Sequence, residues 1–230
     1  MFSPSLWRST WAILRKDLRA ELRGRVAINT LLLFAITTVV LVSFRLGPLG
    51  ISRDQRAVTS IAVLLWIAIF FAAMSGLSRS FVAEEEAGTA PLLRLAASPA
   101  AVFAGKLLYN LLLVAVLEAL VVLLFAALMN LRVGNPGLFA ASLAAGGVGL
   151  GVATTIIAAL VARASVRGAL FTVLAFPLLL PLLVVAVGAT ELALAGAGWS
   201  KAWPELRLLA AYVLALLAAS LLLFEQVWEG

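Results

Sequence analysis

Six long apolar runs constrain this sequence more than any other feature. Each has roughly the 20 residues that an α-helix needs to cross the hydrocarbon core of a bilayer, and none carries Asp, Lys or Arg in its middle. The runs cover residues 26–44, 57–77, 107–128, 138–162, 169–187 and 206–224. The sequence therefore predicts an all-α polytopic membrane protein, with six transmembrane helices in a single domain over residues 1–230.

The composition agrees with a lipid environment. Hydrophobic residues make up 64% of the 230-residue chain and charged residues only 12%, whereas soluble domains are about 45–50% apolar and about 25% charged. This length leaves no room for a soluble domain beyond short loops. We read the net charge of +6 as an affinity for anionic lipid headgroups rather than for nucleic acid.

The distribution of basic residues predicts the orientation of the spans. With the N-terminus in the cytoplasm, eleven Lys and Arg residues face the cytoplasm and six face outward, which together account for all 17. We therefore expect a multi-pass membrane protein with both termini in the cytoplasm.

An amphipathic helix is predicted before the first span, over residues 5–24. Its apolar residues fall on one helical face and basic residues fill the rest, a pattern typical of a helix lying in the headgroup plane. A plain polybasic orientation signal is the less favoured alternative. The residues expected at the membrane surface are Trp7, Trp11, Arg15, Lys16 and Arg19.

The segment 78–105, between the second and third spans, is predicted to cross the cytoplasmic face. It holds an acidic cluster, a glycine break at Gly88 and a short helix that Thr89 can cap. Ser98 and Pro99 form a typical start for the next helix. The residues expected to matter in this segment are Glu84, Glu85, Glu86, Gly88, Leu92, Arg94, Ser98 and Pro99.

No catalytic constellation is visible. The chain has no His and no Cys, so it offers neither thiol chemistry nor the usual ligands for zinc or haem iron. It also lacks the glycine-rich phosphate loop of ATP-binding proteins. The sequence predicts a non-enzymatic membrane subunit that binds no cofactor by itself.

Glu118 is the one ionisable residue expected deep in the membrane. It follows Lys106 by twelve positions, which is about 18 Å along a helix. Intramembrane carboxyl groups usually face a bundle interior or a cavity. We keep two interpretations open: a role in a translocation path or a helix–helix lock, and a hydrogen-bonded packing residue.

Two prolines, Pro177 and Pro181, lie inside the fifth span. Proline bends a membrane helix and frees carbonyl groups that neighbouring helices can satisfy. The pair predicts a local kink, for which we favour static packing over gating.

The order of these features resembles the ABC-2-type permeases, and within them the CcmB family, the haem exporter protein B of cytochrome c maturation. The likeness covers nearly the whole chain, with the order and spacing of individually weak motifs carrying the match. Glu118 departs from it, because some members of the family have an apolar residue there. The matching stretches are Leu14–Arg23, Phe81–Thr89, Leu92–Leu93, Ser98–Pro99, Gly105–Lys106, Arg163–Gly168 and Leu174–Leu183.

The resemblance implies a permease subunit whose energy comes from a separate ATPase. It implies pairing with a CcmA-type ATPase that binds ATP and Mg²⁺, a second copy of this chain, CcmC- and CcmD-like membrane proteins and the haem chaperone CcmE. The short helix in segment 78–105 would then be the coupling element that docks on the ATPase. Because the chain lacks His and Cys, we expect a partner to hold the haem and this subunit to drive release of the haem-loaded chaperone.

Two other functions stay open at this point. One is an ABC-2 permease for another substrate, such as a lipid, drug or polysaccharide. The other is a membrane scaffold without transport activity.

Overall fold

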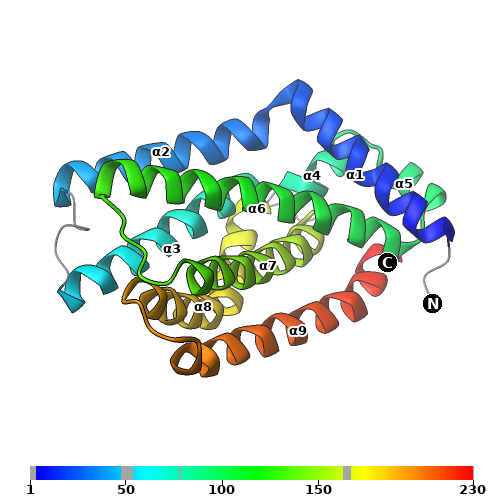
Figure 1. Ribbon diagram of the computed structural model, residues 1–230. Helices are drawn as coiled ribbons and strands as arrows, with labels where there is room; N and C mark the ends of the chain where they lie inside the picture. The colour runs from blue at the N-terminus through cyan, green and yellow to red at the C-terminus, as the bar shows by residue number, and fades with distance from the viewer. Residues whose placement is uncertain (1–3, 48–53, 78, 163–166, 230) are drawn as a thin grey trace.

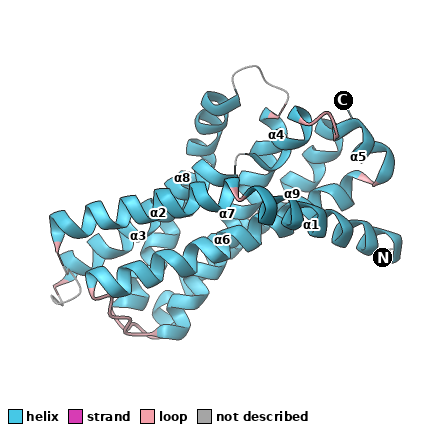
Figure 2. Ribbon diagram, turned by 90° about the horizontal axis from the view of Figure 1, so that it is seen from above, coloured by secondary structure: helices cyan, strands magenta, loops and turns pink. Residues whose placement is uncertain are grey.

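The computed structural model describes residues 4–47, 54–77, 79–162 and 167–229, and each regular element in these ranges is an α-helix. Figure 2 shows the helices throughout and the loops confined to their ends. The order is α1 (Pro4–Gly24), α2 (Val26–Leu46), α3 (Gln55–Leu77), α4 (Arg79–Glu86), α5 (Ala90–Ala96), α6 (Pro99–Met129), α7 (Pro136–Val161), α8 (Arg167–Leu194) and α9 (Trp199–Glu229).

Six of these helices are long and apolar enough to cross a membrane, which confirms the predicted fold class. They are α2, α3, α6, α7, α8 and α9, and both chain termini lie at the same end of the bundle as α4 and α5 (Figure 1). The connections α6–α7 and α8–α9 lie at the opposite end. A shared end for both termini is what an even number of spans requires, and its assignment to the cytoplasm stays a prediction.

The helices extend beyond the apolar runs that predict them. α6 begins at Pro99 rather than near residue 107, α8 continues to Leu194, and α9 already begins at Trp199. Hydropathy locates the part of a helix that suits lipid, whereas backbone hydrogen bonding continues until a residue stops it. For α6 that residue is Asn130, which has a left-handed conformation with φ 52°.

α7 lies at the centre of the bundle, in contact with α3, α4, α6, α8 and α9. Its glycines let neighbouring helices approach closely, as expected for packing in lipid. The Trp66 ring of α3 occupies the place that a side chain at Gly146 would need. A Cβ atom at Gly149 would lie 2.5 Å from a methyl group of Leu182 in α8.

α1 packs along α6 and joins α2 through a sharp turn at Arg25, which has φ 53°. Its inner face carries Thr10, Ile13 and Asp17, all buried, while Trp7 and Trp11 are exposed. Leu14, an apolar residue of the same helix, is also buried against the bundle. The protein-facing side of α1 is therefore rotated away from the tryptophans, and contact of the latter with lipid stays a prediction.

α8 runs unbroken through Pro177 and Pro181, which lie on its exposed side. Between them, the carbonyl oxygen of Leu178 accepts a hydrogen bond of 2.5 Å from the Tyr212 hydroxyl of α9. A neighbouring helix thus adds a hydrogen bond in the proline-containing turn, and the choice between static packing and gating stays a prediction.

Candidate functional site

The segment predicted to couple to an ATPase folds into two short helices, α4 and α5, rather than one. Gly88 separates them with φ +65°, a left-handed conformation that glycine adopts without a steric cost. The backbone N–H of Thr89 donates to Glu84 O at 3.0 Å and that of Gly88 to Glu85 O at 3.2 Å. This pair of bonds is a Schellman motif, which ends α4 and turns the chain into α5.

The capping residues occupy the predicted positions but do not act as predicted. Thr89 stands at the N-cap of α5 and Ser98 at the N-cap of α6, yet neither side chain makes a capping hydrogen bond. The Thr89 hydroxyl donates instead to the Glu84 carboxylate, with an O···O distance of 2.6 Å. The hydroxyl group that could have capped α5 therefore binds a side chain of α4 instead.

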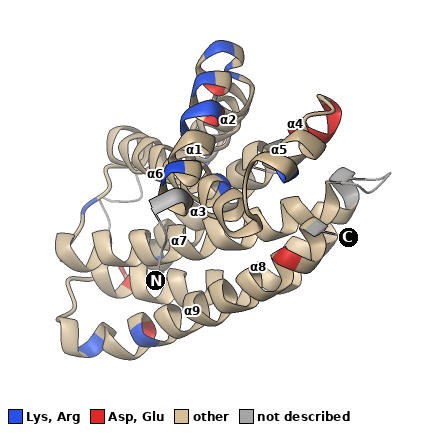
Figure 3. Cartoon of the chain, turned by 90° about the vertical axis from the view of Figure 1, so that its right-hand side faces the viewer, with Lys and Arg blue, Asp and Glu red and all other residues tan. Residues whose placement is uncertain are grey.

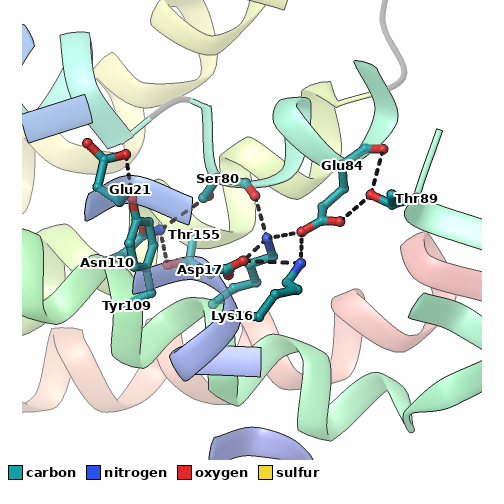
Figure 4. A network of polar contacts seen from close by, with 10 residues as sticks. Lys16, Asp17, Glu21, Ser80, Glu84, Thr89, Tyr109, Asn110 and Thr155 are labelled. Carbon is teal, nitrogen blue, oxygen red and sulfur yellow. Dashed lines mark hydrogen bonds and ion pairs between the residues drawn. The ribbon is translucent and has the colours of Figure 1, made fainter. Parts of the chain in front are cut away.

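A buried ion cluster, formed by Lys16, Asp17, Glu84 and Lys106, joins α1, α4 and α6 (Figure 4). Lys106 is 2% exposed and Glu84 7% exposed. The Lys106 Nζ lies 2.8 Å from Glu84 Oε1, 3.0 Å from Asp17 Oδ2 and 2.8 Å from the Ser80 carbonyl oxygen to which it donates. Charges buried this deeply are stable only when paired and hydrogen-bonded, and Lys106 meets both conditions.

Lys16 closes the cluster from its exposed side. Its ammonium group pairs with Glu84 Oε1 and lies 3.2 Å from Asp17 Oδ1. Burial alone would lower the pKa of Lys16, but the hydrogen bond from Lys16 to Glu84 and the charges of both carboxylates raise it above its ordinary value. Lys16 therefore serves an ion pair inside the chain as well as the basic surface of α1.

A second set of polar contacts continues from the cluster along α6. The Tyr109 hydroxyl donates to Glu21 Oε2 at 3.2 Å, and Glu21 Oε1 accepts the backbone N–H of Ile28 at 2.8 Å. Asn110 donates to the Thr155 hydroxyl of α7 at 2.8 Å. These contacts fix the start of α2 and the C-terminal part of α7 relative to α6.

A cavity of about 360 Å³ opens between these groups. The ion cluster lines one part of it, and Glu21, Tyr109 and Asn110 line another. Within the described residues, no group of three His, Cys, Asp or Glu side chains is placed to hold a metal ion.

An aromatic cluster, Phe81, Phe103, Phe224 and Trp228, ties α4 and α6 to the last turns of α9. The Phe81 ring centroid lies 5.6 Å from that of Phe224, which lies 5.1 Å from that of Phe103 and 5.6 Å from that of Trp228. Arg94 of α5 places its guanidinium carbon 5.0 Å from the Trp228 ring centroid, a cation–π distance. The C-terminal helix is therefore joined to both short helices.

The eight predicted coupling residues fall into an inner and an outer group. Glu84 is inside, and Arg94 lies between Trp228 and Glu85, whose carboxylate is 3.8 Å away. Leu92 is outside and 66% exposed, and the neighbouring Leu95 is 88% exposed. Glu86, Gly88 and Ser98 also lie at the surface and Pro99 is half-buried, while Glu85 lies partly buried beside Arg94.

Several members of the network were not among the predicted site residues. They are Asp17, Glu21, Lys106, Tyr109 and Thr155. A signal existed for two of them, because Asp17 and Glu21 are four residues apart and so share one face of an otherwise basic helix. Their partners are distant in sequence and no local pattern identifies them.

Charged residues gather on α1 and near α4 and α5, and most of the remaining ribbon in Figure 3 is free of them. Glu118 lies within the apolar run 107–128 of α6. It is buried between α6 and α7 and belongs neither to the ion cluster nor to the cavity beside it.

Comparison with known proteins places this arrangement in a family. The family model described as CcmB protein matches residues 8–226. Heme exporter protein B of Bradyrhizobium diazoefficiens is 29% identical over 187 residues, which cover 80% of this chain and 82% of the relative. The chain, a multi-pass membrane protein with α4 and α5 at the end that holds both termini, belongs to the CcmB family.

Proposed function

We propose that this chain is the membrane subunit of a haem exporter that acts in cytochrome c maturation. Membership of the CcmB family and similarity to a protein called Heme exporter protein B support this function. The chain has no phosphate loop of its own, so a separate CcmA-type ATPase with bound ATP and Mg²⁺ supplies the energy. The assembly lies in the bacterial inner membrane, with both termini in the cytoplasm.

The exposed apolar face of α5 is the observation that carries the coupling part of this proposal. Leu92 and Leu95 project from a short helix at the end that also holds both termini. Exposed apolar surface of this kind, flanked by polar residues, marks protein–protein contacts. An amphipathic helix that lays such a face into a groove of its partner is a recurrent mode of recognition.

Two connections carry motion of α5 into the membrane. The first runs from Thr89 through Glu84 to Lys106 of α6. The second runs from Arg94 to Trp228 of α9, against which Phe224 stacks. A push on α5 by the ATPase therefore displaces α6 and α9 together, because Glu84 and Lys106 in the first link and Trp228 in the second are buried.

The remaining partners follow from the same function. We propose an assembly with a second copy of this chain, CcmC- and CcmD-like membrane proteins and the haem chaperone CcmE. Haem iron is usually held by His, Cys, Met or Tyr, and this sequence has no His or Cys. Only Met and Tyr remain as candidate ligands in this chain. We therefore assign the haem to a partner, and this subunit converts ATP hydrolysis into release of the haem-loaded chaperone.

The coupling is tested by changing the exposed face of α5 without touching its buried links. We expect the double substitution Leu92→Asp and Leu95→Asp to reduce co-purification with a CcmA-type ATPase at least tenfold, because two charges would enter an apolar contact. Leu46→Asp is the matched control, since Leu46 is an exposed leucine at the opposite end of the bundle. Undiminished association of the double variant would show that α5 is not the docking element.

The assignment of haem to a partner has its own test. The purified chain, in detergent and without partners, should show no stoichiometric haem binding by absorbance titration. A saturable one-to-one complex would contradict the assignment and leave the coupling role of α5 untouched.

A further inference from the structure

Glu118 differs from the other buried charged residues because its environment is apolar. It is 8% exposed, and its Oε1 has no hydrogen-bond partner within the described residues. The carboxyl group lies directly against α7, since a Cβ atom at Gly147 would be 2.6 Å from Glu118 Oε1 and 2.9 Å from Oε2. An acceptor left unpaired in an apolar site carries a desolvation cost of about 1–3 kcal/mol.

The carboxyl group faces a groove of about 540 Å³ between α6 and α7. Small residues form both walls at four-residue spacing, with Ala115 and Ala119 on α6 and Ala140 and Ala144 on α7. All four alanines are exposed on the outside of the bundle. Small residues at this spacing let another transmembrane helix approach closely.

The chemistry of the groove narrows the choice of occupant. Its lining contains one acceptor, Glu118, and no side-chain hydrogen-bond donor. A lipid acyl chain brings no donor. A second copy docked groove to groove by a two-fold axis would place two Glu118 carboxyl groups opposite each other, and these could pair only with at least one of them protonated.

We propose that the α6–α7 groove binds a transmembrane helix of a different protein, which presents a hydrogen-bond donor such as Asn to Glu118 near the middle of the membrane. The alanines provide close packing and Glu118 provides selectivity among apolar helices. This interface is separate from α5. It deepens the proposed function, on which it rests for the presence of membrane-protein partners, and its failure would leave the docking of α5 on an ATPase unaffected.

The test uses the full chain in vesicles of phosphatidylcholine and phosphatidylglycerol. Because the sequence has no cysteine, Arg132→Cys in the exposed α6–α7 loop provides a single site for a donor fluorophore. The probes are two synthetic Leu/Ala transmembrane helices with an acceptor dye, identical except for Asn or Leu at the central position. Energy transfer then reports the association of each helix with the chain.

We expect the Asn helix to bind about 3- to 30-fold more tightly than the Leu helix, the range set by interhelical hydrogen bonds in membranes. Glu118→Leu should abolish this preference, and Glu118→Gln should keep it because the amide oxygen still accepts. Ala144→Phe fills the groove from an exposed position and should weaken the binding of both synthetic helices. Ala215→Phe, at an exposed alanine of α9, is the matched control and should change neither.

Two results would overturn the proposal. Equal binding of the Asn and Leu helices to the unmodified chain would mean that Glu118 does not select a donor-bearing helix, and would leave lipid or a second copy as the occupant of the groove. A preference for Asn that survives both Glu118→Leu and Ala144→Phe would place the contact elsewhere on the surface.

Discussion

Glu84 and Glu118 are almost equally buried, yet their surroundings are opposite. Glu84 accepts from Lys106, Lys16 and Thr89 in the cluster between α1, α4 and α6. Glu118 lies against a glycine backbone in an apolar groove, and its Oε1 has no partner within the described residues. Burial alone therefore does not indicate what a charged residue does. Glu84 organises the chain that contains it, whereas Glu118 is available to a molecule outside the chain.

Removing the charge of Lys106 should lower the unfolding free energy more than any change at Glu84 or Glu118. Lys106→Met leaves the Asp17 and Glu84 carboxylates close together with only the partly exposed Lys16 between them. Breaking a buried ion pair from one side typically costs about 3–5 kcal/mol, so we expect a loss of that size in unfolding free energy. Unfolding in detergent, followed by circular dichroism, measures it.

Lys201→Met is the control for that experiment, because Lys201 is exposed near the start of α9. If both lysine variants lost the same stability, the ion cluster would not hold the helices together.

Neutralising Glu84 should cost less, because Lys106 keeps Asp17 and the Ser80 carbonyl oxygen as partners. We expect Glu84→Gln to lower the unfolding free energy by about 1.5–3 kcal/mol, the range for hydrogen bonds to charged groups. The loss of the charged link should also make α4 and α5 more sensitive to limited proteolysis. Glu225→Gln, at an exposed carboxylate of α9, should leave both measurements unchanged.

Removing the hydroxyl of Tyr109 tests a weaker contact at the edge of the polar network. Tyr109→Phe removes one hydrogen bond to Glu21 and keeps the ring. We expect a loss of about 0.5–1.5 kcal/mol in unfolding free energy. Faster amide exchange at the start of α2 should accompany it, because Glu21 also accepts from Ile28. An unchanged exchange rate there would mean that Glu21 positions α2 without help from Tyr109.

Glu118→Leu should have the smallest effect on the unfolding free energy of the isolated chain. It tests most directly whether Glu118 differs from Glu84 in having no partner inside the chain. Replacing an unpartnered acceptor by an apolar side chain is close to neutral or stabilising. We expect a destabilisation of at most about 0.5 kcal/mol. A loss above about 2 kcal/mol in the same unfolding assay would mean that Glu118 is a packing residue with an internal partner, like Glu84.

Much of the fold follows from local properties of the sequence. Apolar runs of spanning length predict α2, α3, α6, α7, α8 and α9 because water and lipid separate residues by polarity wherever the helices finally pack. The break between α4 and α5 follows from Gly88, and the beginning of α6 from Ser98 and Pro99. These features depend on neighbours within a few residues, so the sequence alone contains them.

The tertiary structure decided which polar groups meet. Glu84 lies 68 residues after Lys16 and 22 before Lys106, and no periodicity connects positions so far apart. It also decided the rotation of α1, because a helix with tryptophans on one side and Asp17 and Glu21 on another offers two faces to bury. Hydrophobicity favours burial of the tryptophan face. The face that carries Asp17 packs against α6 instead, because buried Lys106 of α6 needs a carboxylate partner. Membrane residence is thus a property of this sequence, whereas the opposite roles of Glu84 and Glu118 exist only in the folded bundle.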